Sequence, residues 1–127
     1  QYRELLGSAL CVFNSNNSFI IETILRLDAN YSWYHLIDLE SGKLKKFVQD
    51  AISEKYDSKI EQLFSELIDQ RNRIVHSFQI TNKQNKQVLA TKVYHESEQF
   101  EITEDYLLNF IKLNEKLSDM LHDFRGY

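Results

Sequence analysis

The chain has 127 residues, of which 43% are apolar, and a formal net charge of −4. This length and apolar content fit one globular domain, residues 1–127, with a modest hydrophobic core. The negative charge excludes a protein that coats nucleic acid by bulk electrostatic attraction, so any nucleic-acid site has to be local.

Hydropathy excludes a membrane protein. No apolar run reaches the roughly 18 residues of a membrane span, and no basic-then-apolar leader opens the chain, so we expect no membrane partner. The single cysteine, Cys11, cannot form a disulfide within the chain, and its apolar neighbours predict a buried thiol in a cytoplasmic protein. The start at Gln1 rather than Met is compatible with trimming from a longer chain.

Residues 2–28 predict one long amphipathic helix, because apolar residues recur there every three or four positions. The polar run 14–18 makes a break the main alternative, since Asn and Ser compete for backbone hydrogen bonds. In an unbroken helix Asn17 lies within the apolar stripe. It then needs a buried hydrogen-bond partner, or it faces a second subunit.

The segment 29–42 predicts a connection that includes a helical turn. Its aromatic residues are expected to plug the end of the helical bundle, and for Trp33 the alternative is stacking on a nucleic-acid base. An apolar stripe from Leu44 to Tyr56 predicts the second helix, with its lysines on a solvated face.

The third helix has the clearest start signal. Ser58 and Glu61 have the spacing of a capping box, and apolar residues follow on one face of 60–68. This helix continues into residues 71–76, which carry polar groups that its packing does not require.

The hydrophobic period changes after residue 76. Alternation within 78–81, 88–94 and 99–102 predicts two or three short strands that form an edge hairpin. Thr103 is then expected to cap a last amphipathic helix. The predicted fold class is mostly α: a four-helix bundle with a short β-hairpin excursion between helices three and four.

Three residues of the third helix, Arg71, Asn72 and His76, form the candidate site. Positions four apart on a helix differ by about 40° in direction, so Asn72 and His76 share a face, and Arg71 lies about 100° from Asn72. Histidine titrates near neutral pH, and a guanidinium offers paired donors to phosphate oxygens. Such a group is suited to binding and cleaving a phosphodiester.

A purely structural alternative also explains the charge. Basic residues in the last turn of a helix favour the negative end of its dipole, and Arg71 could pair with Glu66, with Asp69 or with a carboxylate on another helix. Capping does not explain the Asn next to the Arg or the His four positions later.

The pattern Arg71-Asn72-x-x-x-His76 resembles the signature of the HEPN superfamily, the higher-eukaryote and prokaryote nucleotide-binding domains. That signature is an Arg, a polar neighbour and a His after four to six residues, at the end of the third helix of a four-helix bundle. The resemblance implies a HEPN-like bundle that forms a homodimer, and an RNA endonuclease that needs no metal and no cofactor. It also implies a toxin–antitoxin, defence or stress-response context, with an antitoxin protein as a candidate partner.

The resemblance assigns a role to each residue of the trio. His76 would act as acid or base on the 2′-hydroxyl or the leaving oxygen, Arg71 would stabilise charge at phosphorus, and Asn72 would orient them. A toxin subgroup of the family carries a modifiable Tyr two residues after the His, where this chain has Phe78. Because other members only bind nucleotides or proteins, a non-catalytic HEPN module is the alternative function.

Three further basic residues and the four histidines are the remaining candidates for binding RNA or a metal. Arg73, Lys83 and Lys86 are expected to contact RNA, and a plain polar loop is the alternative for the two lysines. The histidines lack metal-ligand spacing to Asp or Glu, so we assign no metal site. These are His35, His76, His95 and His122.

Overall fold

A computed structural model describes residues 2–27, 32–39, 41–53, 58–92 and 99–125. Helices account for 77% of the described residues, and the remaining regular structure is a small antiparallel sheet. The prediction of a mostly α chain with a short β excursion is therefore confirmed. None of the described helices is both long and apolar enough to cross a membrane.

The elements follow one another in a simple order. The first part of the chain is helical: α1 (Tyr2–Leu27), α2 (Trp33–Asp38), α3 (Ser41–Val48), the π-helical turn η1 (Gln49–Ser53) and α4 (Lys59–Val75). Three strands come next, and the last helix ends the described chain: β1 (Phe78–Thr81), β2 (Gln87–Lys92), β3 (Gln99–Ile102) and α5 (Glu104–Arg125).

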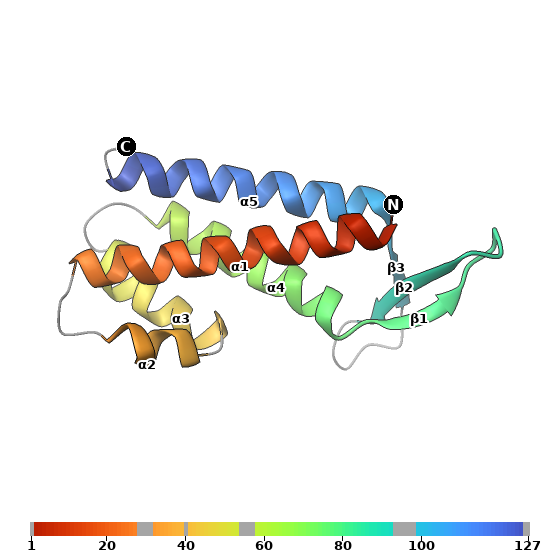
Figure 1. The fold of residues 1–127 in the computed structure, drawn as a ribbon, viewed down its shortest axis with the longest axis horizontal. Coiled ribbons are helices and arrows are strands. Elements are labelled where there is room, and N and C mark those ends of the chain that lie inside the picture. The colour runs from red at the N-terminus through yellow and green to blue at the C-terminus, as the bar shows by residue number, and fades with distance from the viewer. Residues whose placement is uncertain (1, 28–31, 40, 54–57, 93–98, 126–127) are drawn as a thin grey trace.

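Three long helices, α1, α4 and α5, pack against one another and form the body of the molecule (Figure 1). The helices α1 and α5 run in the same direction along the long axis, and α4 runs the opposite way. At one end α2 packs on α1, and α3 packs on α1 and α4. At the other end the hairpin of β1 and β2 projects away from the helices, so the end of α4 lies between the helical body and the sheet.

Three stacked phenylalanines lie at the centre of the core. The ring centroid of Phe13 on α1 lies 6.3 Å from that of Phe64 on α4 and 6.1 Å from that of Phe110 on α5. All three side chains are at most 1% exposed. Since the three rings come from three helices, this stack joins the helices of the body in one contact.

The helix α1 is unbroken across the polar run, because one asparagine of that run is satisfied inside the core. The side chain of Asn16 is 5% exposed, and its Nδ2 donates to the backbone oxygen of Asn114 at 2.7 Å and to Oδ1 of Asn114 at 3.1 Å. The Nδ2 of Asn114 in turn donates to the backbone oxygen of Phe110 at 2.9 Å. A buried polar position was predicted at Asn17, and the structure places it at Asn16, with Asn17 half-buried.

Two expectations about burial near the chain start are wrong. Trp33 is 45% exposed and Tyr34 is 77% exposed, their rings packing edge to face on one another at 5.4 Å, whereas Leu36 carries the buried contact of α2. A six-residue helix has room for little more than one inward position, and Leu36 occupies it. Cys11 is exposed, because it lies on the outer face of α1, opposite Phe13.

The second and third predicted helices are present, but the predicted cap is not. Leu44, Val48 and Ile52 form the inward stripe of α3 and η1, and Tyr56 lies outside the described residues. The helix α4 begins at Lys59, but the side chain of Ser58 caps no backbone amide. Its Oγ instead accepts a hydrogen bond of 2.8 Å from Nε2 of Gln62, so the capping-box prediction is wrong.

Two or three strands in an edge hairpin were predicted, and the structure has three, in one antiparallel sheet of order β1-β2-β3, with Phe78 opposite Ala90 and Leu89 opposite Ile102. The hydroxyl of Tyr2 ties this sheet to the start of α1. It donates to the backbone oxygen of Ile102 at 2.6 Å and accepts from the backbone amide of Leu89 at 3.3 Å. Burial raises the pKa of this hydroxyl, partly offset by the bond from Leu89.

The predicted cap of the last helix is confirmed. The Oγ1 of Thr103 accepts a hydrogen bond of 3.0 Å from the backbone amide of Tyr106, which satisfies a donor in the first turn of α5. Inward residues of α5 include Leu107, Phe110 and Leu117.

We expect Asn16→Ala to lower the free energy of unfolding by about 1–3 kcal/mol, because the polar groups of Asn114 would lose their buried partner. Urea denaturation measures this change. The matched control is Asn14→Ala, which removes an exposed asparagine from the same helix. Equal stability of the two variants would contradict the role given to the buried asparagine pair.

Candidate functional site

The last turn of α4 positions the three residues of the candidate site. His76 is the C-terminal cap residue of α4, with φ of −95° and ψ of 22°. Its backbone amide donates to the backbone oxygen of Asn72 at 3.0 Å, which is the bond of a regular helical turn. Ser77 closes the end of the helix with its hydroxyl, which donates to the backbone oxygen of Ile74 at 2.6 Å. The helical geometry thus reaches His76, so Asn72 and His76 project from one face of the helix.

Arg71 projects from a different face, toward α1. It comes two turns after Phe64, so it continues the inward stripe of α4. Its guanidinium carbon lies 5.1 Å from the ring centroid of Phe13, and its Nε is buried. Cation–π contacts of this kind contribute from about 0.5 to 2 kcal/mol. The aromatic core therefore fixes where the positive charge of Arg71 is held.

Asn72 lies in the wall of a surface depression between α3 and α4. Its side chain is half-buried. The depression has a volume of about 520 Å³ and six further lining residues: Lys45, Gln62, Ser65, Glu66, Ile68 and Asp69. The carboxamide of Asn72 therefore forms part of the polar wall of this depression along α4.

His76 is exposed, and so is its neighbour Val75, at 52%. The structure thus places Asn72 and His76 on one helix face and directs Arg71 about 100° around the helix to Phe13. Sequence reasoning predicted this angular relation. It did not predict the aromatic partner of Arg71, because Phe13 lies on another helix, 58 positions away.

Arg73, predicted to contact RNA, is half-buried and faces the start of α5. Burial raises the pKa of the Tyr106 hydroxyl to about 12; the negative charge of Asp69 adds to the shift and the positive charge of Arg73 opposes it. The same hydroxyl donates to the backbone oxygen of Gln70 at 3.2 Å. Arg73 therefore acts electrostatically on Tyr106, on a different side of α4 from Asn72.

Lys83 and Lys86, the other predicted RNA contacts, are exposed in the turn between β1 and β2. The side chain of Asn82 orders this turn, its Oδ1 accepting from the backbone amides of Gln84 and Lys86 at 3.0 Å each. Asn85 has a positive φ of 62°. Four strand residues separate the turn from the end of α4, a span of roughly 13 Å. The two lysines are thus carried away from His76 by the projecting hairpin.

Lys45 is a functional candidate that sequence reasoning missed, because it was assigned to a solvated face. The structure shows its side chain half-buried, with Nζ donating to Oγ of Ser65 at 3.2 Å. It lines the same depression as Asn72. No local sequence signal distinguishes it from its exposed neighbour Lys46, since the packing of α3 on α4 makes the difference.

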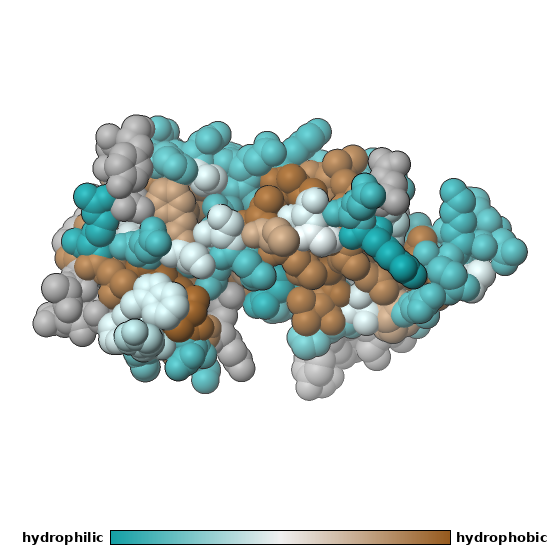
Figure 2. All heavy atoms as spheres, viewed as in Figure 1, coloured by the Kyte–Doolittle hydropathy of each residue, from teal (hydrophilic) through white to brown (hydrophobic). Residues whose placement is uncertain are grey.

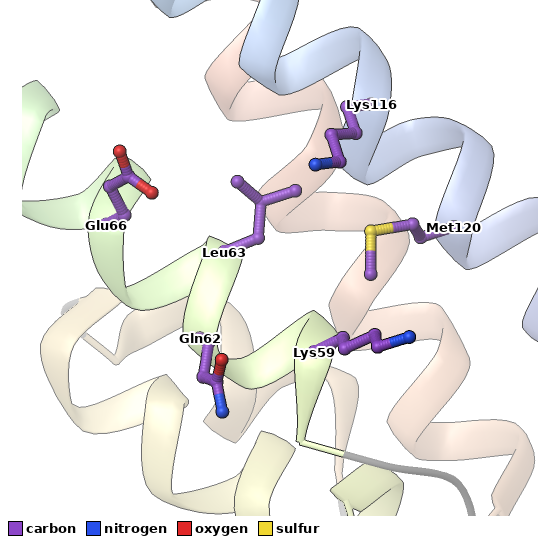
Figure 3. Close-up of a pocket in the computed structure, with 6 residues that line it drawn as sticks. All are labelled: Lys59, Gln62, Leu63, Glu66, Lys116 and Met120. Carbon is purple, nitrogen blue, oxygen red and sulfur yellow. The ribbon is translucent and has the colours of Figure 1, made fainter.

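A second depression lies between α4 and α5, on the other side of Gln62 and Glu66 (Figure 3). Leu63 and Met120 give it apolar walls, and Lys59 and Lys116 are its basic residues. Figure 3 shows the sulfur of Met120 and the side chain of Leu63 between these two lysines.

Side chains that can ligate a metal do not cluster in the part of the chain that the structure describes. In these residues no three His, Cys, Asp or Glu side chains gather closely enough to hold a metal ion. The ring of His122 packs edge to face on Phe19 at 4.7 Å, and its Nδ1 lies 2.8 Å from the backbone oxygen of Ser118. His95 lies outside the described residues.

No protein-family model matches the chain, and neither a curated protein nor a solved structure is significantly similar to it.

Proposed function

We propose that the protein is a metal-independent RNA endonuclease of the HEPN type, built on a HEPN-like four-helix bundle and active as a homodimer. One observation carries the proposal. An exposed imidazole ends α4, one turn after a carboxamide that lines a polar depression, while a guanidinium is held on the adjacent face of the same turn. A toxin–antitoxin, defence or stress-response role, with an antitoxin partner, rests on the resemblance alone.

The exposure of His76 suits it to acid–base chemistry on RNA. As a base it would take the proton of a ribose 2′-hydroxyl, whose oxygen then attacks the neighbouring phosphorus. The bond from phosphorus to the 5′-oxygen breaks, and the protonated imidazole or water gives that oxygen the proton with which it leaves. The products are a 2′,3′-cyclic phosphate and a 5′-hydroxyl. Positioned general acid–base catalysis typically contributes about 10²–10⁴-fold in rate.

The contact of Arg71 with Phe13 supports its role in binding phosphate. A guanidinium that is already restricted by an aromatic ring loses less conformational entropy when it binds a phosphate. A fixed cation stabilises the negative charge that develops in the transition state more than a mobile cation does, because it needs no reorganisation during the reaction. Asn72, next to it in the chain, would orient the ribose or the phosphate.

Exposed apolar residues near the end of α4 support the homodimer. Val75 is 52% exposed, Phe78 on β1 is 41% exposed and Leu108 on α5 is 41% exposed. Figure 2 shows apolar surface over the first half of α1, on the side of the molecule from which the hairpin projects. A second copy that covers this region would bring its own Arg71, Asn72 and His76 near the first set.

A specific observation favours the second candidate function, a non-catalytic module that binds a nucleotide or a protein. Arg71 is directed toward Phe13, on a different face from His76, as expected for a cation with a structural role. In such a module, substitution of His76 changes the affinity for a nucleotide or partner, and no RNA is consumed. Calorimetry with the protein in stoichiometric amounts separates the two functions.

We expect the purified protein to cleave single-stranded RNA in the presence of EDTA, and His76→Ala and Arg71→Ala each to slow cleavage by at least about 100-fold. Gel analysis of RNA with labelled ends measures the rate and the product termini. The control His122→Ala removes a different exposed histidine and should retain activity. Full activity in both site variants, with unchanged circular dichroism, would refute the nuclease assignment.

We expect Val75→Asp to raise the dimer dissociation constant by about 100-fold or more, because a carboxylate would be buried against apolar side chains. Sedimentation velocity over a range of concentrations measures this. Tyr34→Asp is the control, since it places the same charge at another strongly exposed residue, on α2 at the far end of the molecule. A wild-type protein that stays monomeric at all concentrations would contradict the dimer.

A further inference from the structure

We infer that the depression between α3 and α4 binds the nucleotide next to the scissile phosphate, that it favours guanosine, and that Lys45 holds a phosphate of that nucleotide. This inference rests on the proposed RNA cleavage. It adds a subsite, a base preference and a residue on α3 to a site otherwise built from α4.

The depression adjoins the candidate site. Asn72 belongs both to the candidate site and to the wall of the depression. His76 follows Asn72 on the same face, one helical turn further along α4. A nucleotide in the depression would therefore lie directly beside the group that is proposed to move protons.

The depression has the size of a site for a small ligand. Its volume of about 520 Å³ falls in the range typical of small-ligand sites, roughly 300–1,000 Å³. Six of its seven lining residues are polar or charged, and Ile68 is the apolar exception. Such a lining suits a hydrogen-bonding ligand such as a nucleotide better than an apolar one.

Lys45 supplies the positive charge of the depression. It is half-buried, and its hydrogen bond of 3.2 Å to Oγ of Ser65 holds the ammonium group against α4. Within the described part of the chain no ion pair joins Lys45 to Glu66 or Asp69. An ammonium group with three donors, one of which is used, retains donors for phosphate oxygens.

Two carboxylates on the α4 side of the depression give the base preference. Glu66 and Asp69 can only accept hydrogen bonds when ionised, so they favour a base edge that carries donors. Guanine has adjacent N–H donors on its Watson–Crick edge, which a carboxylate can bind with two parallel hydrogen bonds. Nε2 of Gln70 donates to Oε1 of Glu66 at 3.3 Å and helps to hold that carboxylate.

The depression between α4 and α5 is a weaker candidate for this nucleotide. It shares Gln62 and Glu66 with the first depression but contains no residue of the Arg71, Asn72 and His76 set. Its Lys116 therefore provides a matched control for Lys45, because replacing either lysine removes one positive charge from a depression beside α4.

The first experiment compares Lys45→Gln with Lys116→Gln in RNA cleavage. We expect Lys45→Gln to lower kcat/KM by about tenfold, the effect of losing one charged hydrogen bond, and Lys116→Gln to stay close to wild type. Equal rates for the two variants would overturn the subsite while leaving the nuclease assignment intact.

The second experiment uses uridine oligomers that each carry one guanosine or one adenosine. We expect the wild-type protein to cleave next to the guanosine about tenfold faster than at the uridines, which is the discrimination that one bidentate base contact provides. The double variant with Glu66→Gln and Asp69→Asn should lose this preference. Cleavage spread evenly along the guanosine oligomer, or concentrated next to adenosine, would overturn the inference. A wild-type protein that cuts none of the oligomers would overturn both the inference and the nuclease.

Discussion

The contact between Phe13, Phe64 and Phe110 is the interaction on which the rest of the structure depends. It joins α1, α4 and α5 through rings at most 1% exposed, and burying each such side chain contributes roughly 1.5–3 kcal/mol. The same Phe13 ring carries the guanidinium of Arg71 at 5.1 Å. The packing that closes the helical body therefore also sets the position of the cation at the candidate site.

The helical phase of α4 distributes its polar residues over three sides of the molecule. Arg71 continues the inward stripe toward α1, Asn72 enters the depression beside α3, and Arg73 faces Tyr106 at the start of α5. Consecutive residues on a helix differ by about 100°, so three neighbours cannot share one face. The guanidinium of Arg71 therefore points away from Asn72 and His76 of its own chain, and a composite site in the proposed dimer would overcome this separation.

The long helices and the β excursion could be predicted from sequence because their apolar residues recur with a clear period, whereas α2 was expected only as a helical turn in a connection and η1 was not distinguished from the second helix. Contacts between distant segments could not be predicted from the sequence. Asn16 rather than Asn17 is buried, since the partner that satisfies it, Asn114, lies on another helix. Lys45 is indistinguishable from its neighbouring lysines until α3 packs on α4. Trp33 was expected inside with the other aromatic residues at the end of the bundle, but the short α2 buries Leu36 instead. The residue types and helical spacing of the candidate site were predictable. The contact of Arg71 with the ring of Phe13 and the depression beside Asn72 were not.

The most direct test of the account is RNA cleavage by Phe13→Leu compared with Phe110→Leu. Both substitutions remove one ring from the same core stack, but only Phe13 contacts Arg71. The account predicts similar losses of thermal stability and, below both melting temperatures, a fall in kcat of about tenfold for Phe13→Leu alone. Equal kcat values for the two folded variants would contradict the claim that the aromatic core positions the catalytic cation.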